Sequence, residues 1–369
     1  MNKTRQDDRS PFVSGKSAPV TVIILNYNGA DVVKRCVRSF AAQRVLPKQV
    51  LFIDNGSSDF DQNELRSLFG TRYSSRLRFL AFKENLGYSK GMNRGLAWVL
   101  AEPNPTEWIM TLNNDTALEE DFFESLLKVA EAIKDQSKCS LGMLSPKVLS
   151  MSSPDELDAA GLVLSLDGMS SARGQREKDL RQYDDKLEVL APNGVSAIYR
   201  ASMLRQIGLY DERFEAYCED TDLGFRAWLA GWNCRFEPAL RLYHSRSTSH
   251  GNHSLRKLYL VERNHFWFAI KNYPAPLLIL GPAFTAWRYL VQAYSIARKR
   301  GQGRGFSFQA KTRFLVFATL RALFDALRGS PEMFLARIRL RRLRKRSEIE
   351  VLTTLWRGRL NFQELILKE

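Results

Sequence analysis

The segment from residue 20 to residue 29, VTVIILNYNG, decides the fold class of this chain. Its first six residues are apolar without interruption and rich in β-branched side chains, which is typical of a strand buried on both faces of a parallel sheet. The Asn-Tyr-Asn-Gly that follows predicts a turn, and apolar residues at helical spacing come next, between Val32 and Phe40. Asp31 stands where a side chain can cap that helix. A strand, a turn and a helix in this order predict the first unit of an α/β sheet.

The same pattern recurs further along the chain. Short apolar runs predict strands at residues 50–53, 77–82 and 108–112, and residues 89–100 have the pattern of a helix. Each strand ends in a polar loop that carries Asn, Asp or Gly. Because ligands of open α/β sheets bind beyond the carboxyl ends of the strands, we expect these loops to form one site. The fold class predicted for the chain is therefore α/β, with a doubly wound mixed sheet.

From residue 191 onward the pattern changes. Residues 193–199 predict a strand and residues 201–207 a short helix. A segment dense in acids and aromatics follows, and it leads into a helix at residues 222–229. A last strand is expected near Arg235 and leads to His244.

Charge is distributed unevenly along the chain. The formal net charge is +15, yet the first 244 residues carry 31 Lys and Arg against 33 Asp and Glu, while the remainder carries 24 against 7. A basic segment of this kind indicates a tail that meets an anionic surface, either lipid or nucleic acid. We therefore divide the chain into a disordered lead at residues 1–18, a catalytic domain at 19–254, and a helical, basic, membrane-associating region at 255–369.

Two short apolar runs, at residues 274–287 and 314–327, lie within the basic region. Each is shorter than the roughly 20 apolar residues that span a bilayer and is flanked by cations, as expected of helices lying at an anionic membrane surface. The alternative is that these helices pack on the catalytic domain or form a homo-oligomer interface. The polar N-terminus lacks the apolar core of a signal peptide, and the four cysteines have neither disulfide nor zinc spacing. We expect a cytoplasmic protein, peripheral on the inner face of the cell membrane.

A nucleic-acid-binding protein is a rival class, since a basic tail would also suit that function. The near-neutral charge of the first 244 residues argues against it, because that part of the chain offers no electrostatic footprint for a polyanion. No nucleic-acid partner is therefore expected.

Two strand ends carry carboxylates suited to a nucleotide and a metal. Asp54 follows a buried strand, where it either serves a turn or accepts a hydrogen bond from a pyrimidine or ribose. Asn113-Asn114-Asp115 ends another strand, and its oxygens either cap the next helix or hold a hard divalent cation. The segment Gly87–Gly95 combines small residues with Lys90 at the start of a helix, which suits phosphate oxygens.

Glu219-Asp220-Thr221-Asp222 is the densest acidic cluster of the chain. Three carboxylates within four residues repel one another, which raises at least one pKa and suits a general base. The alternative is that Asp220 or Thr221 caps the following helix while the other acids face water. His244 is either a core histidine or a site residue, and the histidines at 244, 250 and 253 do not match a helical zinc pair.

Taken in chain order, the strand-end Asp54, the Asn113-Asn114-Asp115 motif, the acidic cluster and His244 resemble the motifs of the family-2 glycosyltransferases with the GT-A fold. The resemblance is strongest to bacterial rhamnosyl- and galactofuranosyl-type members that build surface polysaccharide, and it covers about residues 20–274. The matching segments are TVIILNYNG at 21–29, FIDNGSSD at 52–59, NLGYSKGMNRG at 85–95, LNNDT at 112–116 and GLYDERFEAYCEDTDLGFRAWLAG at 208–231.

The resemblance implies a role for each matched position. Nucleotide and diphosphate binding is expected of Leu25, Tyr27, Asp54, Gly87, Lys90, Asn93 and Asn114. The Asp-x-Asp motif of the family corresponds to Asn113-Asn114-Asp115, so the expected ligands of Mg²⁺ or Mn²⁺ are Asn113, Asp115 and His244. The first acid of that motif is Asn here, which leaves Asp115 as its only charged ligand. The catalytic base corresponds to Asp220, with Glu219 and Asp222 beside it.

The activity implied by the resemblance is metal-dependent, inverting sugar transfer. The donor is a dTDP-, UDP- or GDP-linked sugar, with rhamnose among the candidates, and the acceptor is a hydroxyl of a glycan or lipid-linked glycan. Asp220 would take the proton of that hydroxyl, whose oxygen attacks the anomeric carbon opposite the leaving diphosphate. A nucleotidyltransferase is a second rival. It would share the sheet and the metal, but such enzymes usually have a basic, Gly-rich loop where this chain has Asn-Tyr-Asn-Gly.

Overall fold

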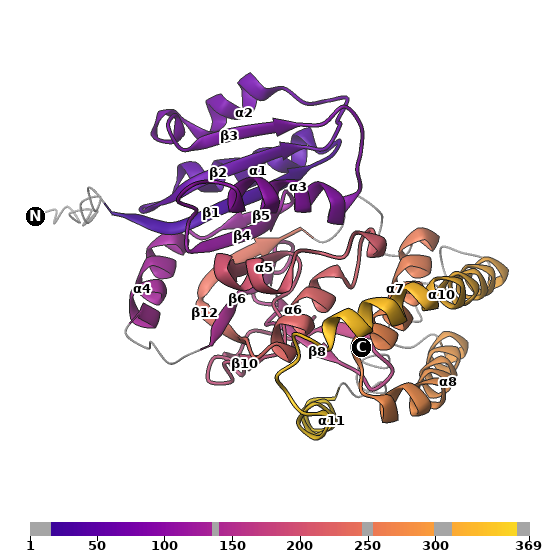
Figure 1. Cartoon of the computed structure of the whole chain (residues 1–369). Helices are drawn as coiled ribbons and strands as arrows, with labels where there is room; N and C mark the ends of the chain where they lie inside the picture. Colours follow the sequence, from indigo (N-terminus) through magenta and orange to yellow (C-terminus); the bar gives the residue numbers. More distant parts are fainter. Residues whose placement is uncertain (1–15, 135–139, 246–253, 299–311, 360–369) are drawn as a thin grey trace, which may run out of the picture.

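The computed structural model describes residues 16–134, 140–245, 254–298 and 312–359. Residues 1–15 of the expected disordered lead lie outside this part of the chain, and the first strand already begins at Ser17. Figure 1 shows a sheet with helices packed around it and the C-terminal helices gathered at one end of the molecule.

The main sheet is mixed. Its central path is β10-β12-β6-β11-β4-β1-β2-β3, in which β1 is parallel to β2 and β4, and β11 is antiparallel to β4 and β6. The doubly wound α/β class expected from the sequence is therefore confirmed. The strands are β1 Ser17–Asn26, β2 Leu46–Asp54, β3 Leu77–Ala81, β4 Trp108–Asn113, β5 Thr116–Leu118, β6 Leu141–Ser150, β7 Leu157–Ala159, β8 Leu162–Leu164, β9 Ser170–Ala172, β10 Glu188–Val189, β11 Ser196–Arg200 and β12 Asn233–His244.

Helices cover both faces of this sheet. The helices of the described residues are α1 Ala30–Ala41, α2 Gln62–Phe69, α3 Tyr88–Leu100, α4 Phe122–Lys134, α5 Ala201–Ile207, α6 Glu219–Leu229, α7 Leu255–Asn272, α8 Ala275–Arg298, α10 Thr312–Leu340 and α11 Glu348–Arg357, with 3-10 turns η1 Thr71–Tyr73 and η2 Glu212–Phe214. Those from α1 to α6 pack on the sheet. Alternate residues of β1 enter different cores: Val22 packs with α1 and α4, whereas Ile23 packs with α3. This alternation explains why the strand is an unbroken apolar run.

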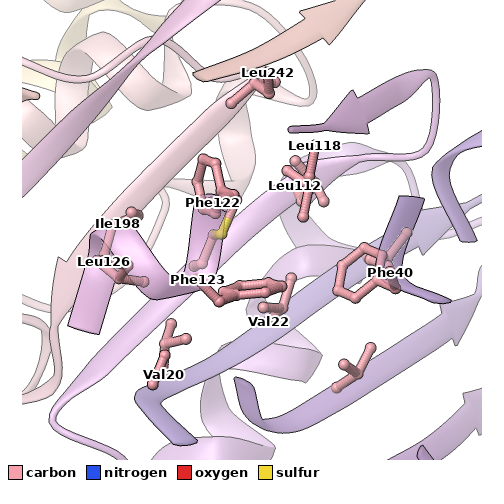
Figure 2. Close-up of a cluster of buried hydrophobic side chains, with 14 of the residues drawn as sticks. Val20, Val22, Phe40, Leu112, Leu118, Phe122, Phe123, Leu126, Ile198 and Leu242 are labelled. Atoms are coloured by element: carbon pink, nitrogen blue, oxygen red, sulfur yellow. The ribbon is translucent and has the colours of Figure 1, made fainter. Parts of the chain in front are cut away.

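The larger core lies between the sheet and helices α1 and α4. Figure 2 shows Phe123 of α4 beside Val22, and its ring centre lies 5.7 Å from that of Phe40. These side chains and the neighbouring Phe122 are fully buried. Burial of such side chains contributes about 1.5–3 kcal/mol each to folding. This core holds β1 and β4 in place, and the ends of these two strands carry the predicted site.

One local expectation is wrong. Asp31 does not cap α1, since it is exposed and the N-cap residue is Gly29, which makes no side-chain cap. The carboxylate of Asp59, in the loop after β2, instead accepts a hydrogen bond from the Ala30 N–H at 3.1 Å. The loop after the second strand therefore supports the start of the helix that follows the first.

The C-terminal helices include one that is an integral part of the core. Helix α7 packs against both α6 and α10, and its Phe268 joins a buried cluster with Phe225 of α6. The packing therefore continues across residue 254, where we expected the catalytic domain to end. Among the described residues, no helix is both long and apolar enough to cross a membrane.

Candidate active site

The ends of β1 and β2 present the residues expected to bind the nucleotide. Asp54 is the last residue of β2 and pairs in register with Asn26 of β1. It is buried, and both of its carboxylate oxygens lie within 3.3 Å of the Ser57 N–H, so it also closes the turn after the strand. Tyr27 is exposed beside it, with its ring available to a planar base. Leu25 lies opposite both Ile53 and Asn113 on the neighbouring strands.

The Asn113-Asn114-Asp115 motif lies at the end of β4 and touches the same turn. The amide of Asn114 donates a 2.7 Å hydrogen bond to Asn26 Oδ1. A Cβ at Gly29 would lie 2.7 Å from Asn114 Nδ2, so only glycine allows the turn and the motif to approach this closely. The backbone N–H of Asn113 donates to the carbonyl of Val195 at 3.0 Å.

Asp115 and His244 form a carboxylate–imidazole pair. Strand β12 pairs His244 with Thr116 of β5, which brings His244 Nε2 to 3.3 Å from Asp115 Oδ2. The other ring nitrogen, Nδ1, lies 2.6 Å from Asp158 Oδ2. Burial alone would lower the pKa of His244, but the hydrogen bonds to Asp115 and Asp158 outweigh this effect and raise it to about 9. Asp158 was not among the residues expected from the sequence.

This pair has the chemistry of a metal site with two protein ligands. Asp115 Oδ1 is buried without a hydrogen-bond partner in the described part of the chain, and Asp158 holds His244 from behind as a carboxylate often holds a metal-binding histidine. No group of three His, Cys, Asp or Glu side chains among the described residues could hold a metal ion. Mg²⁺ typically takes one or two carboxylates and completes its shell with substrate phosphates and water, so the donors present fit such an ion.

Asp220 is held by backbone donors at the start of α6. Its Oδ2 accepts a 2.7 Å hydrogen bond from the Gly194 N–H, and its Oδ1 accepts one of 2.7 Å from the Thr221 N–H. The side chain is half-buried, and burial raises its pKa despite these hydrogen bonds. A carboxylate with a raised pKa and fixed orientation has the properties of a general base.

The two acids beside Asp220 differ from it and from each other. Glu219 is buried, its Oε2 has no hydrogen-bond partner among the described residues, and burial and Asp220 raise its pKa well above the usual range. Asp222 is fully buried and accepts from Arg226 Nε at 2.8 Å and Lys271 Nζ at 2.9 Å. Burial favours a raised pKa for Asp222, but these two cations lower it. The contacts give Asp222 a structural environment, in contrast to the catalytic role expected of it.

In the segment at the start of α3, one expected ligand residue is exposed and another is buried. Gly87 has a φ of 80° directly before the helix, and Lys90 is exposed in its first turn. Asn93, expected to bind the diphosphate, is instead buried, where its amide nitrogen donates to the Tyr210 carbonyl at 2.9 Å and its oxygen accepts from the Tyr210 N–H at 3.0 Å. It joins α3 to the segment before η2.

Tyr88 contacts the residue that orients Asp220, since its hydroxyl donates to the Gly194 carbonyl at 3.4 Å. The pKa of its phenol is raised well above the usual range by burial first, and then by Tyr210 and the charges of Glu219, Asp220 and Asp115. Sequence reasoning missed Tyr88, although it lies within the quoted segment, because a tyrosine beside a glycine carries no charge pattern.

The loop before α6 has an unusual backbone. Glu215, Tyr217 and Cys218 have φ values of 63°, 66° and 67°. The left-handed region costs a non-glycine residue about 1–2 kcal/mol. Three such residues directly before Glu219 and Asp220 require support from other parts of the chain.

Comparison with known proteins gives one family and several distant relatives. A sequence model of "Glycosyl transferase family 2" matches residues 21–207. The N-acetylglucosaminyl-diphospho-decaprenol L-rhamnosyltransferase of Mycobacterium tuberculosis is 25% identical over 276 residues, covering 67% of this chain and 85% of that relative. The poly-beta-1,6-N-acetyl-D-glucosamine synthase of Staphylococcus aureus is 20% identical over 223 residues, 59% of this chain and 48% of the relative.

A solved structure is also similar over most of the chain. The mannosyltransferase PcManGT from Pyrobaculum calidifontis, in complex with GDP-Man and Mn²⁺, has a TM-score of 0.48 and 14% sequence identity. The similarity covers 94% of this chain and 91% of that one.

Proposed function

Because the chain belongs to glycosyl transferase family 2, we propose that it is an inverting glycosyltransferase whose catalytic base is Asp220. The mixed α/β sheet is the GT-A fold indicated by the sequence. One observation carries the proposal. Gly194 orients the Asp220 carboxylate, and the next residue, Val195, is hydrogen-bonded to Asn113, so base and strand-end motif share one support.

The donor binds at the ends of β1, β2 and β4. Tyr27 offers an exposed ring to the base, and Asp54 a buried carboxylate to the nucleoside. Lys90 lies in the first turn of α3, where a helix N-terminus and a cation both favour phosphate oxygens. The space beside Gly87 is open, since nothing lies within 4 Å of the place a Cβ would take. These features support a diphosphate site at the carboxyl edge of the sheet, near Asp115.

Asp115 and His244 would hold Mg²⁺ or Mn²⁺ at this edge. Their side chains offer one carboxylate and one imidazole nitrogen, with Asp158 fixing the imidazole. Such an ion, when bound, neutralises negative charge on a diphosphate leaving group. Asn113 lies at the same strand end and is half-buried, which supports a place for its side chain at the edge of this site.

The chain's own residues then perform a single displacement. Asp220 accepts the proton of the acceptor hydroxyl as its oxygen forms a bond to the anomeric carbon. The bond from that carbon to the diphosphate oxygen breaks on the opposite face, and the electron pair leaves with the nucleoside diphosphate. One displacement inverts the anomeric centre. The backbone donors on Asp220 favour its charged form, which keeps it competent as a base although burial opposes ionisation.

The acceptor proposed is a glycan or a lipid-linked glycan of the cell surface, and the sugar is L-rhamnose. Support comes from the Mycobacterium relative, whose name describes rhamnosyl transfer to N-acetylglucosaminyl-diphospho-decaprenol. Helices α8 and α10 expose large apolar side chains, among them Ile279, Trp287, Phe317 and Leu327, within the basic part of the chain. We propose that this surface rests on the anionic inner face of the cell membrane, where a lipid-linked acceptor would lie.

A ligand screen tests the proposal. Thermal unfolding would be followed with UDP, GDP and dTDP, each with and without Mn²⁺, and then with dTDP-rhamnose, UDP-N-acetylglucosamine and GDP-mannose. We expect one nucleoside diphosphate to stabilise the protein more with Mn²⁺ than without it. With an N-acetylglucosaminyl-diphospho-polyprenol acceptor, of the kind named for the Mycobacterium relative, the matching sugar donor should yield a product of inverted anomeric configuration by NMR. A product with retained configuration, or no stabilisation by any nucleotide, would contradict the proposal.

A further inference from the structure

The backbone that leads into Asp220 is held in place by a helix on the other side of the loop. Glu215, Tyr217 and Cys218 adopt positive φ, and Cys218 is the N-cap residue of α6 without a side-chain cap. Non-glycine residues avoid this region, so the loop would relax to another conformation if nothing held it. Any such relaxation would move Asp220, which lies two residues beyond Cys218.

Asn264 of α7 supplies the support. Its side-chain nitrogen, fully buried, lies 2.8 Å from the carbonyl oxygen of Phe214, 2.9 Å from that of Ala216 and 2.8 Å from that of Tyr217. The two hydrogens of this one amide are therefore shared among three carbonyl oxygens of the loop. A buried carbonyl without a donor is costly, so these bonds favour the observed loop over its alternatives.

Arg263 fixes the direction of that amide. Its Nε donates to Asn264 Oδ1 at 3.0 Å, which leaves only the nitrogen of Asn264 to face the loop. Its Nη1 donates to the Glu215 carboxylate at 2.8 Å, and its guanidinium lies 4.3 Å from the centre of the Trp267 ring. The arginine is thus held by an ion pair and a ring contact and has one orientation available.

The same helix also holds the chain on the far side of Asp220. Lys271 Nζ and Asn272 Nδ2 each donate to the Asp222 carboxylate at 2.9 Å. From α3, the N–H and hydroxyl of Ser89 donate to the Glu215 carbonyl at 3.0 and 2.9 Å. The loop is therefore bonded to α7 before and after Asp220, and to the helix that carries Lys90.

We propose that Asn264, oriented by Arg263, is a positioning residue that sets the place of the Asp220 carboxylate. This inference rests on the proposed function, because it takes Asp220 as the base. It assigns part of the catalytic apparatus to α7, which lies beyond the segment 21–207 matched by the family. Asn264 itself touches backbone and Arg263 only, so its effect on the reaction passes through the loop.

The test compares Asn264→Ala with the parent enzyme and with Leu126→Ala. Leu126 is fully buried in α4 within the core of Figure 2, so its truncation destabilises the fold without touching the loop. The readout is release of nucleoside diphosphate from dTDP-rhamnose, UDP-N-acetylglucosamine or GDP-mannose, with Mn²⁺ and an N-acetylglucosaminyl-diphospho-polyprenol acceptor of the kind named for the Mycobacterium relative. Misplacing a catalytic group by about 1 Å costs about 10²-fold, so kcat of Asn264→Ala should fall by that order with KM for the donor within about twofold. An equal fall in Leu126→Ala, at a matched loss of Tm, would overturn the proposal.

A second comparison places Asn264→Ala in an Asp220→Asn background. If Asn264 acts through Asp220, the double variant should be no slower than Asp220→Asn alone. If the losses in kcat of the two single variants multiply in the double variant, the positioning role of Asn264 is wrong, but Asp220 can still be the base. If Asp220→Asn is active, both the assignment of the base and the role of Asn264 are wrong. Should Asn264→Ala fail to fold, Arg263→Lys serves the same cycle, since it keeps the charge but loses the fork that orients the amide. A fall in kcat that disappears in the Asp220→Asn background is again the expected result.

Discussion

The backbone N–H of Gly194 donates a 2.7 Å hydrogen bond to Oδ2 of Asp220. Gly194 lies just before β11, and β11 pairs with β4 so that Ser196 is opposite Leu112. The orientation of the proposed base is thus tied to the strand that ends in Asn113-Asn114-Asp115. A rigid sheet holds these two parts of the site in one geometry, and this is the arrangement that a precise displacement reaction requires.

Removing the charge of Asp220 should stop turnover while leaving the donor bound. We expect Asp220→Asn to lower kcat by about 10²–10⁴-fold, which is the usual contribution of a general base, with donor affinity nearly unchanged. Calorimetry with the nucleoside diphosphate and Mn²⁺ would measure the affinity. Asp61→Asn, at the N-cap of α2, is a matched change outside the site and should stay active. If Asp220→Asn were active and Glu219→Gln inactive, the proposed base would be wrong and Glu219 would take that role.

A side chain at position 194 should also impair Asp220, because it would crowd the carboxylate. A Cβ at Gly194 would lie 2.8 Å from Asp220 Oδ2, closer than real contacts allow. Gly194→Ala should therefore displace the carboxylate and lower kcat by about 10-fold or more, since small displacements of a catalytic group are costly. Gly281→Ala is the control, because its Cβ would meet nothing within 4 Å. Equal rates for the two variants would show that the Gly194 contact does not set the position of the base.

Metal dependence should weaken when either half of the Asp115–His244 pair is removed. Asp115→Ala and His244→Ala should each raise the Mn²⁺ concentration needed for half-maximal rate and weaken binding of the nucleoside diphosphate. Asp158→Asn should have a smaller effect, about 10–100-fold in metal affinity, because Asp158 acts on the metal through the orientation of His244. Full activity of the parent enzyme in excess EDTA would refute the assignment.

Glu219 should make the free energy of unfolding fall as the pH rises above 4.5. Burial and the neighbouring Asp220 raise its pKa well above 4.5, so above pH 4.5 the unfolded chain releases a proton that the folded chain keeps. The free energy of unfolding then falls by up to about 1.4 kcal/mol for each pH unit until the folded-state pKa is reached. Glu219→Gln removes this titration and should raise Tm at pH 8, with a difference that shrinks toward pH 4.5. The same difference at both pH values would mean that Glu219 is ionised in the folded protein.

The sequence predicted the parts of this architecture that depend on local pattern. The strands at β1 to β4 and the helix at 201–207 follow from apolar runs and spacing. The four strands are parallel, so their polar carboxyl ends lie at one edge of the sheet. Strand β6 was missed although all ten of its residues are buried. It contains Ser145 and Lys147, which break the apolar run, and Lys147 is buried only because Asp179 and Asp184 pair with it. That pairing depends on tertiary contacts, which a local pattern cannot show.

The residues missed at the site have the same explanation. Asp158 reaches His244 because β7 pairs with β6 at an irregular register and β6 pairs with β12. Asn264 lies 44 positions after Asp220 in a helical run whose spacing indicates only a buried face. Asn93 and Asp222 were assigned to ligand and catalysis from motif position, but the structure buries both against partners that spacing does not show.

Helices α8 and α10 should bind anionic membranes through their exposed apolar side chains. Phe317 and Leu327 of α10 are 65% and 73% exposed, so changing them to Glu should leave the fold intact. The parent protein should float with liposomes that contain anionic lipid, more weakly at high salt but not abolished, because cations add about 1 kcal/mol each while apolar burial is insensitive to salt. Phe317→Glu/Leu327→Glu should lose most of this binding, whereas Leu180→Glu, a residue 77% exposed between β9 and β10, should retain it. A parent protein that stays in the soluble fraction at low salt, and sediments as an oligomer that the double variant disrupts, would instead assign this face to a second copy of the chain.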